Sequence, residues 1–381
     1  MNVAMLPETR NSTMRPRLFV GILLTLWIGS AQAAGEDWPM FRGDPSRQGV
    51  SEERLRGKLK LAWVHEMNAP VRCSAATANE SVFVGNDEGL FICLSLEDGK
   101  KRWTFKAKGA IESSPAVKEG RVFFGDDWGL FYALDESNGE ELWRFEAGDK
   151  FVASPAVEGS SLFIGSYDSF LYCLDASEGT LRWKHESDAQ IHCSPCLSQD
   201  AALTGGCDGF LRWVNKKDGA LLRKVEVRDV VAATPVCVGD RIYIAVLEGR
   251  ILCLDANTGE VFWDEPVGKE TPELMASPAV KGNRWIQGAR DGRVRCFDTD
   301  TGKLIWSFET KGDVDSSPVV AGKDVFFGSM DGNLYRVSLE DGKSSWQFPA
   351  ASPIAASPAV SRNRLVIGTE DGAVYCFKGG N

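Results

Sequence analysis

The chain repeats one pattern of about forty residues along most of its length. The clearest copy, residues 113–145, reads SSPAVKEGRVFFGDDWGLFYALDESNGEELWRF. One position of the repeat is held by Pro115, Pro155, Pro195, Pro235, Pro278, Pro318 and Pro358. These prolines are spaced by 40 residues, except for one step of 43, and Ala75 holds the same position one period earlier, giving eight copies. A period sustained this long restricts the chain to a repeat architecture.

Each copy is predicted to form four short β-strands separated by turns. In the copy quoted above we expect strands at residues 113–117, 122–125, 130–134 and 141–145. The turns between them contain glycine, which supplies the positive φ that tight hairpins need. The proline at the start of the first strand is tolerated there if its missing donor faces an unpaired edge. No stretch has a helical period, so we predict an all-β chain whose units are the blades of a propeller.

The two ends of the repeat region predict how the ring closes. The last copy, from residue 356 to 377, supplies three strands and then stops, whereas residues 58–64 (KLKLAWV) form a strand with no partners before it. Pairing that strand with the last blade completes an eight-bladed propeller over residues 58–378 and removes an exposed sheet edge. A seven-bladed ring with one discarded repeat is the alternative. Residues 34–57 are expected to be an irregular lead-in segment.

A tryptophan closes nearly every copy, and its periodicity predicts a structural role. We expect these residues to pack between neighbouring blades: Trp63, Trp103, Trp143, Trp183, Trp263, Trp306 and Trp346. The fourth copy departs from the pattern, because Arg223 stands in place of the tryptophan and Asn215 in place of a recurrent aspartate.

Residues 1–33 have the three parts of a secretory signal, namely basic residues, a short apolar run and the small-residue site Ala31-Gln32-Ala33. Met1 or Met14 could start the chain. We therefore expect an exported, soluble protein, periplasmic or extracellular, with no transmembrane span in the mature chain. No cysteine follows the apolar run, so lipid attachment there has no acceptor. The net charge of −10 argues against nucleic-acid binding, and we expect a monomer.

The ten cysteines follow the repeat rather than a disulfide framework. Equivalent cysteines lie one repeat apart, which is too far for a bond whose Cα atoms must be within about 7 Å. We therefore expect buried thiols. Cys193 and Cys196 have the spacing of a redox pair, but a strand would place them on opposite faces, and such motifs draw their chemistry from a helix N-terminus.

The stretch from Ala133 to Trp143 (ALDESNGEELW) resembles the tryptophan-docking motif of pyrroloquinoline-quinone-like (PQQ-like) propellers, in the quinoprotein-like superfamily. Residues 254–263 (LDANTGEVFW) are more similar still, and Trp38-Pro-Met-Phe-Arg-Gly resembles the segment that often precedes such repeats. Membership of the catalytic branch of this family would imply a quinone and calcium on the propeller axis, together with a pair of adjacent cysteines. This sequence has no adjacent cysteine pair. Its short, uniform loops resemble the non-catalytic branch of outer-membrane protein assembly factor B (BamB), which implies a scaffold for protein partners.

The loops predict where a site would lie. Strands alternate in direction, so the loops that enter each first strand share one face with the turns between second and third strands. On that face we predict a mouth formed by Arg72, Glu112, His192 and Asp315, surrounded by Asp127, Trp128, Tyr167 and Arg290. This mouth could bind a small polar ligand, a cation or a peptide, although acidic residues before glycine are also ordinary turn chemistry. Residues 264–275 carry the three extra residues of the long step and could help to contact a partner.

We expect no metal site, because His192 has no second ligand at a fixed spacing, and no nucleophilic triad. The sequence therefore favours an exported, non-catalytic propeller that acts as a protein-interaction scaffold, and the resemblance implies a role in envelope or outer-membrane protein assembly. The alternatives are a PQQ-dependent quinoprotein dehydrogenase and an extracytoplasmic ligand sensor. No cofactor is expected under the first hypothesis, and PQQ and calcium only under the second.

Overall fold

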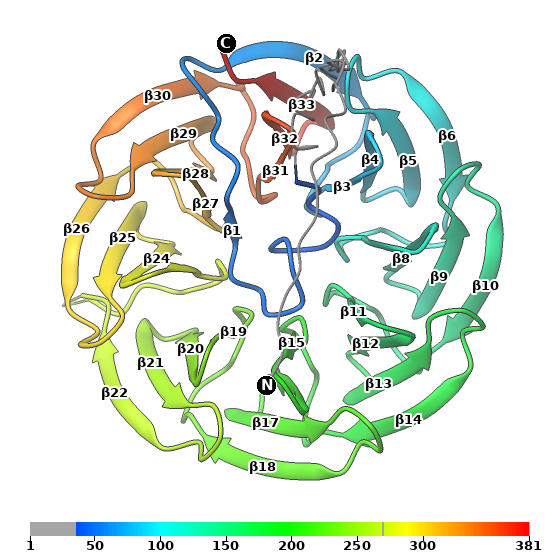
Figure 1. The fold of residues 1–381 in the computed structure, drawn as a ribbon, viewed down its shortest axis with the longest axis vertical. Helices are drawn as coiled ribbons and strands as arrows, with labels where there is room; N and C mark the ends of the chain where they lie inside the picture. Colours follow the sequence, from blue (N-terminus) through cyan, green and yellow to red (C-terminus); the bar gives the residue numbers. More distant parts are fainter. Residues whose placement is uncertain (1–35, 269, 381) are drawn as a thin grey trace, which may run out of the picture. The chain divides into compact units, whose positions relative to one another are not determined.

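The computed structural model describes residues 36–268 and 270–380, which form a ring of eight β-sheets, blades 1 to 8 (Figure 1). Blade 1 contains β3 (Ala76–Ala78), β4 (Ser81–Gly85), β5 (Leu90–Ser95) and β6 (Lys101–Lys106), and blade 2 contains β7 (Ala116–Lys118), β8 (Arg121–Gly125), β9 (Leu130–Asp135) and β10 (Glu141–Glu146). Blade 3 contains β11 (Ala156–Glu158), β12 (Ser161–Gly165), β13 (Phe170–Asp175) and β14 (Leu181–Glu186), and blade 4 contains β15 (Cys196–Leu197), β16 (Ala201–Gly205), β17 (Phe210–Asn215) and β18 (Leu221–Glu226).

Blade 5 contains β19 (Val236–Val238), β20 (Arg241–Val246), β21 (Arg250–Asp255) and β22 (Val261–Pro266), and blade 6 contains β23 (Ala279–Lys281), β24 (Arg284–Ala289), β25 (Arg293–Asp298) and β26 (Leu304–Glu309). Blade 7 contains β27 (Val319–Ala321), β28 (Asp324–Gly328), β29 (Asn333–Ser338) and β30 (Ser344–Pro349), with β1 (Val50–Ser51) added parallel to β27. Blade 8 contains β31 (Ala359–Ser361), β32 (Arg364–Gly368), β33 (Ala373–Lys378) and β2 (Lys60–Glu66).

The all-β, eight-bladed prediction is confirmed, and the burial of the strands explains their composition. The middle strands are buried on both sides, as in β9, because each blade lies face to face with two neighbours. The outermost strands alternate between partly buried and exposed residues, as in β10. The predicted signal segment lies outside the described residues. Within the part of the chain that is described, no helix is long and apolar enough to cross a membrane.

The innermost strand is shorter than predicted. β7 begins at Ala116, so Ser113, Ser114 and Pro115 precede the strand instead of forming its start. Pro115 has no backbone N–H to donate to a ladder. The N–H of Ser114 is also committed elsewhere, because it donates to Oγ of Ser154 in the next blade at 3.0 Å.

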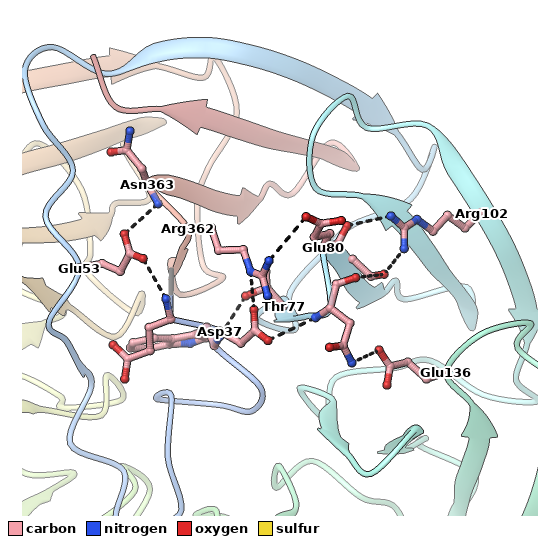
Figure 2. A network of polar contacts seen from close by, with 12 residues as sticks. Asp37, Glu53, Thr77, Glu80, Arg102, Glu136, Arg362 and Asn363 are labelled. Atoms are coloured by element: carbon pink, nitrogen blue, oxygen red, sulfur yellow. Dashed lines mark hydrogen bonds and ion pairs between the residues drawn. The ribbon is translucent and has the colours of Figure 1, made fainter. Parts of the chain in front are cut away.

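The ring closes where the first and last strands meet. β2 pairs antiparallel with β33, which places Trp63 opposite Cys376 and completes blade 8 as predicted. A polar network ties the lead-in segment across this seam (Figure 2). Asp37 accepts hydrogen bonds from Arg362 of blade 8 at 2.9 Å and from the Asn79 N–H of blade 1 at 3.3 Å. The carboxylate of Glu53 accepts from the Asn363 N–H at 2.9 Å.

The lead-in segment, which contains the short strand β1, runs along the inner edges of the blades (Figure 1). Trp38 exchanges two backbone hydrogen bonds with Thr77 of blade 1. The carbonyls of Pro39, Pro45, Ser46, Gln48 and Gly49 accept from N–H groups of the innermost strands of blades 2, 4, 5, 6 and 7, in that order. The expectation that these strands present an unpaired edge is therefore wrong for most blades, because the lead-in segment covers it.

Two buried arginines fasten the lead-in segment. The guanidinium of Arg47 donates to the carbonyls of Ser154 at 3.1 Å, Pro155 at 2.9 Å and Pro195 at 2.9 Å, so it joins blades 3 and 4. Arg42 donates to the carbonyl of Pro278 in blade 6 at 2.7 Å. Burial lowers the pKa of Arg47 to about 10, because the interior disfavours the charged form.

The repeated tryptophans lie between blades, and the geometry of the contact recurs. The indole Nε1 of Trp103 in blade 1 donates to the carbonyl of Glu136 in blade 2 at 2.9 Å. Its ring lies against Gly139, where an added methyl group would lie 2.4 Å from the ring. Equivalent indole-to-carbonyl bonds are made by Trp63, Trp143, Trp183, Trp263 and Trp306. Trp346 instead packs edge-on against Phe377, at a ring distance of 5.4 Å.

Blade 4 compensates for its missing tryptophan. Trp213 of β17 occupies the register position that holds a cysteine or alanine in the other blades except blade 7, which has Arg336 there, and it is paired across the strands with Arg223. Its indole Nε1 donates to the carbonyl of Ala256 in blade 5 at 2.8 Å, which is the bond that a docking tryptophan at position 223 would make. Arg223 lies over the Trp213 ring at 5.7 Å. Thus the indole has moved from the outer strand to the adjacent inner one.

Candidate functional site: a polar cup on the propeller axis

A closed ring of hydroxyl groups lines the axis. The backbone N–H of Ser74 donates to Oγ of Ser114 at 2.9 Å, and the same bond passes from blade to blade until the Ser357 N–H donates to Oγ of Ser74 at 3.1 Å. The members are Ser74, Ser114, Ser154, Ser194, Thr234, Ser277, Ser317 and Ser357. Each oxygen is an acceptor in this ring, so the hydroxyl protons can serve as donors toward the axis.

These hydroxyl groups line a cup of about 160 Å³ that opens on the predicted face. Phe41 of the lead-in segment also lines it. Four of the predicted residues, Arg72, Glu112, His192 and Asp315, line the cup together with Val152, Ala232 and Met275. The structure therefore brings the predicted mouth residues together. The hydroxyl ring is not among the predicted features, although Ser or Thr precedes that proline position in all eight copies.

Two arginine-centred ion-pair groups shape the mouth. Arg72 reaches Asp87 of blade 1 at 2.6 Å and Glu370 of blade 8 at 3.1 Å, and its hydrogen bond to Glu370 raises its pKa. Burial raises the pKa of Asp87, although the charge of Arg72 opposes this shift. On another part of the mouth, Arg290 reaches Asp315 at 2.9 Å.

The second group includes the longer loop. Arg290 also donates to Glu273 at 2.7 Å, and its hydrogen bonds to Asp315 and Glu273 raise the pKa of Arg290. Glu273 lies in the loop that carries the three extra residues, so this loop contributes a charge to the mouth face. Leu274, next to it, is fully buried and anchors the loop.

His192, which lines the cup, forms a neutral pair with Tyr167. The phenol oxygen lies 2.5 Å from Nδ1 of the imidazole. Burial, and then the charge of Lys150, lowers the pKa of His192, while burial raises the pKa of Tyr167 to about 12. Both side chains are thus uncharged near pH 7. Among the described residues, no carboxylate is hydrogen-bonded to this imidazole, as it would be in a Ser-His-Asp triad.

Trp128 is displayed on a rigid turn beside the mouth. It is 69% exposed, the highest value among the large apolar side chains described. The fully buried carboxylate of Asp126 shapes the turn, because it accepts hydrogen bonds from the N–H groups of Trp128 and Leu130 and from the Tyr132 hydroxyl. Asp127 accepts from the Ala110 N–H at 2.8 Å, which ties the turn to the preceding loop. The indole is therefore held in the open by a fixed backbone.

A larger cavity lies away from the mouth, at the boundary between blades 4 and 5. It measures about 700 Å³ and is lined by Trp213, Arg223, Leu222 and Ala201, among others. The equivalent cavities measure about 320 Å³ between blades 1 and 2 and about 40 Å³ between blades 2 and 3. The boundary without a docking tryptophan on its outer strand is thus more open than these two.

The described residues include no group of three or more histidine, cysteine, aspartate or glutamate side chains placed to hold a metal ion. The cup is also smaller than the roughly 300–1,000 Å³ typical of cofactor pockets. What the cup offers chemically is hydrogen bonding to a small polar group at the ring and fixed charges at the rim.

Comparison with known proteins agrees with this architecture. The family described as outer membrane protein assembly factor BamB matches residues 53–146, 126–273 and 247–381. Among solved structures, BamB from Moraxella catarrhalis superposes with a TM-score of 0.74 at 18% identity, covering 84% of this chain and 100% of that one. Quinohemoprotein alcohol dehydrogenase from Comamonas testosteroni superposes with a TM-score of 0.81 at 13% identity, covering 91% and 81%.

The computationally designed Ika8 protein superposes with a TM-score of 0.75 at 17% identity, covering 84% of this chain and 100% of that one. At these identities, the structural matches show a shared fold alone. Among curated protein sequences, none matches the chain.

Proposed function

Because the chain belongs to the outer membrane protein assembly factor BamB family, we propose that it is a non-catalytic scaffold that holds a protein partner against the mouth of its propeller. The observation that carries this proposal is Trp128, 69% exposed on a turn fixed by Asp126. An exposed indole on rigid backbone is the typical anchor of a protein interface, because it buries a large area at little entropic cost. The ion pairs of Arg72 and Arg290 supply a polar rim around it.

The partner we propose is a protein of the cell envelope, and the site of action is outside the cytoplasm. The family name and the signal-like residues 1–33 support this placement. The acidic net charge of −10 disfavours a nucleic-acid partner. A monomeric propeller would leave the whole mouth face available to the partner.

A photo-activated cross-linking residue at position 128 tests the proposal in cells. We expect a discrete cross-linked species containing an envelope protein. The control position is Leu142, which is also exposed (46%) in blade 2 but lies on the outer strand β10. The same cross-linker there should give no such species. An identical pattern from both positions, or none from either, would contradict a partner at the mouth.

Affinity measurement on the captured partner then tests the anchor itself. Trp128→Ala should weaken binding about 30-fold, which corresponds to the loss of roughly 2 kcal/mol typical of a hot spot. Leu142→Ala should leave the affinity unchanged. A Trp128→Ala protein that binds as tightly as the parent would remove the anchor from the proposal.

A quinone-dependent dehydrogenase fits the residues less well. The structural match to quinohemoprotein alcohol dehydrogenase concerns the fold. The cup of about 160 Å³ is lined by hydroxyl groups and by Phe41, and the chain has no adjacent cysteine pair. A visible-light absorption spectrum of the purified protein and titration with quinone and calcium test this alternative. Quinone absorbance, or a calcium-dependent rise in the melting temperature, would favour it over the scaffold.

A ligand sensor has one specific observation in its favour, namely the closed hydroxyl ring at the base of the cup. A small polar molecule could accept hydrogen bonds from those groups and contact Glu112 at the rim. Calorimetric titration with small polar metabolites tests this alternative. Ser154→Ala, which removes one ring hydroxyl, should abolish any heat that reports binding in the cup.

A further inference from the structure

Two of the ten cysteines, Cys196 and Cys237, differ from the rest because their sulfurs lie against each other. Cys73 and Cys193 each contact a glycine carbonyl of their own blade at 3.3 and 3.2 Å. In contrast, Sγ of Cys196 in blade 4 lies 3.1 Å from Sγ of Cys237 in blade 5. Both residues are buried, at 0% and 6% exposure. Their separation of 41 positions in the sequence is not a whole repeat, so an alignment of the copies does not place them together.

The innermost strands bring these thiols together. Cys196 begins β15 directly after Pro195, whereas Cys237 is the second residue after Pro235, in β19. Neighbouring innermost strands converge on the axis, and the Ser194 N–H donates to Oγ1 of Thr234 at 3.1 Å immediately before the two prolines. The offset of one residue therefore directs the two sulfurs at each other across the boundary.

The backbone on both sides is held in place. The Leu197 N–H donates to the Pro45 carbonyl, and the Cys237 N–H donates to the Ser46 carbonyl, so two consecutive residues of the lead-in segment anchor the two strands. Sγ of Cys196 is also 3.3 Å from the Ser46 carbonyl oxygen. A bonded pair of sulfurs lies about 2.05 Å apart, so closing the contact requires a movement of only about 1 Å.

We propose that Cys196 and Cys237 form a disulfide that links blades 4 and 5 when the chain folds in a thiol-oxidising compartment, a condition that rests on the export contained in the proposed function. The oxidant is the disulfide of a thiol–disulfide oxidoreductase. The two thiols lose two protons and two electrons as the new S–S bond forms in this chain. The S–S bond of the oxidant breaks and takes them up as two thiols.

The bond forms during folding rather than afterwards. Burial raises the pKa of Cys196 well above its ordinary value, so the folded protein holds almost no thiolate there to attack an oxidant. Once residues 45–46 are seated, they cover this pair. The same cover then protects the finished bond from reductants. The cross-link strengthens the boundary that lacks an outer-strand tryptophan and carries the cavity of about 700 Å³.

The test is a disulfide map of the protein recovered from the exported fraction. The protein is unfolded without reductant, alkylated, digested and examined by mass spectrometry. We expect one linked peptide pair that joins Cys196 to Cys237, with the remaining cysteines alkylated. Cys196→Ser should abolish the linked pair and lower the melting temperature by several degrees. Cys93→Ser, a buried thiol away from this contact, should retain the link. Alkylation of all ten cysteines in the exported protein would overturn the proposal.

A refolding experiment separates the pairing from the compartment. Reduced, unfolded protein is refolded with oxidised and reduced glutathione, and the disulfide map is repeated. A Cys196–Cys237 link in both samples supports the proposal. A link after refolding but not in the exported protein refutes the cellular bond and locates the fault in the export premise. The scaffold proposal is judged separately, by the cross-link at position 128.

Discussion

The relocated indole of blade 4 gives a sharp prediction about stability. Trp213 is 2% exposed and donates to the Ala256 carbonyl at 2.8 Å. Truncation of a buried tryptophan costs about 3–5 kcal/mol through lost packing, and loss of the hydrogen bond adds about 1 kcal/mol. Trp213→Ala should therefore reduce the free energy of unfolding by about 4–6 kcal/mol. Arg223→Ala should cost less than about 1 kcal/mol, because its described contact is the cation–π contact with Trp213.

Blade 3 provides the matched control, because its tryptophan lies on the outer strand and the smaller residue lies opposite it on the adjacent inner strand. There the docking residue Trp183 lies opposite Cys173. Trp183→Ala should cost about 3–5 kcal/mol, whereas Cys173→Ala should cost about 1 kcal/mol. Urea unfolding followed by circular dichroism measures all four variants, with the slope m as a check that the unfolding transition is unchanged.

The same pair allows a double-mutant cycle. Arg223→Trp alone should destabilise the protein, because Trp213 already occupies the carbonyl that the new indole would need. Combining it with Trp213→Cys converts blade 4 to the usual pair and should recover stability, giving a coupling energy of at least about 1 kcal/mol. If Trp213→Ala cost no more than Arg223→Ala, or the cycle were additive, the idea of a relocated docking residue would be refuted.

Three further outcomes are expected. Arg47→Met should lower the free energy of unfolding by at least about 3 kcal/mol, because it strands buried carbonyls such as those of Pro155 and Pro195; a thermal unfolding curve that does not shift would contradict this. Gly139→Ala should be more destabilising than Gly120→Ala, since both have φ near +75° (77° and 74°) but only the first new methyl group meets Trp103, at 2.4 Å; equal losses would mean that the indole contact contributes nothing. Burial lowers the pKa of His192 in the folded state. As the pH is lowered below about 6.5, the unfolded chain therefore binds the proton first, and the free energy of unfolding decreases until the folded imidazole is protonated as well. Urea unfolding between pH 5 and 7 should show a shallower slope for His192→Asn, and an identical slope would rule the effect out.

Much of the architecture was accessible from the sequence, because the repeat states it many times. The turn glycines, the outer-strand tryptophans and the strand at residues 60–66 are each fixed by a local pattern. The mouth was also predictable in outline, since Arg72, Glu112, His192 and Asp315 occupy one register position in different blades, and all four line the cup. What a repeat predicts well is the set of positions that its copies share.

Features that depend on one copy were harder to predict. The pairing of Cys196 with Cys237 depends on an offset of one residue between two strands, which register alignment removes. The role of Trp213 follows only when the loss at position 223 is considered together with a gain in the adjacent strand. The path of the lead-in segment has no periodic signal, because its contacts are made by backbone carbonyls, which every residue carries.

The hydrogen bonds of the lead-in segment also match the length of this segment to the number of blades. The carbonyls of residues 45, 46, 48 and 49 meet blades 4, 5, 6 and 7 in turn, about one or two residues for each blade. A gene duplication that added a ninth forty-residue unit to this part of the ring would displace every later blade from its carbonyl. The extra inner edge would have no acceptor unless the segment also grew by a residue or two. Growth of the ring is thus coupled to an insertion more than a hundred residues upstream of blade 4, a constraint that the repeats alone do not impose.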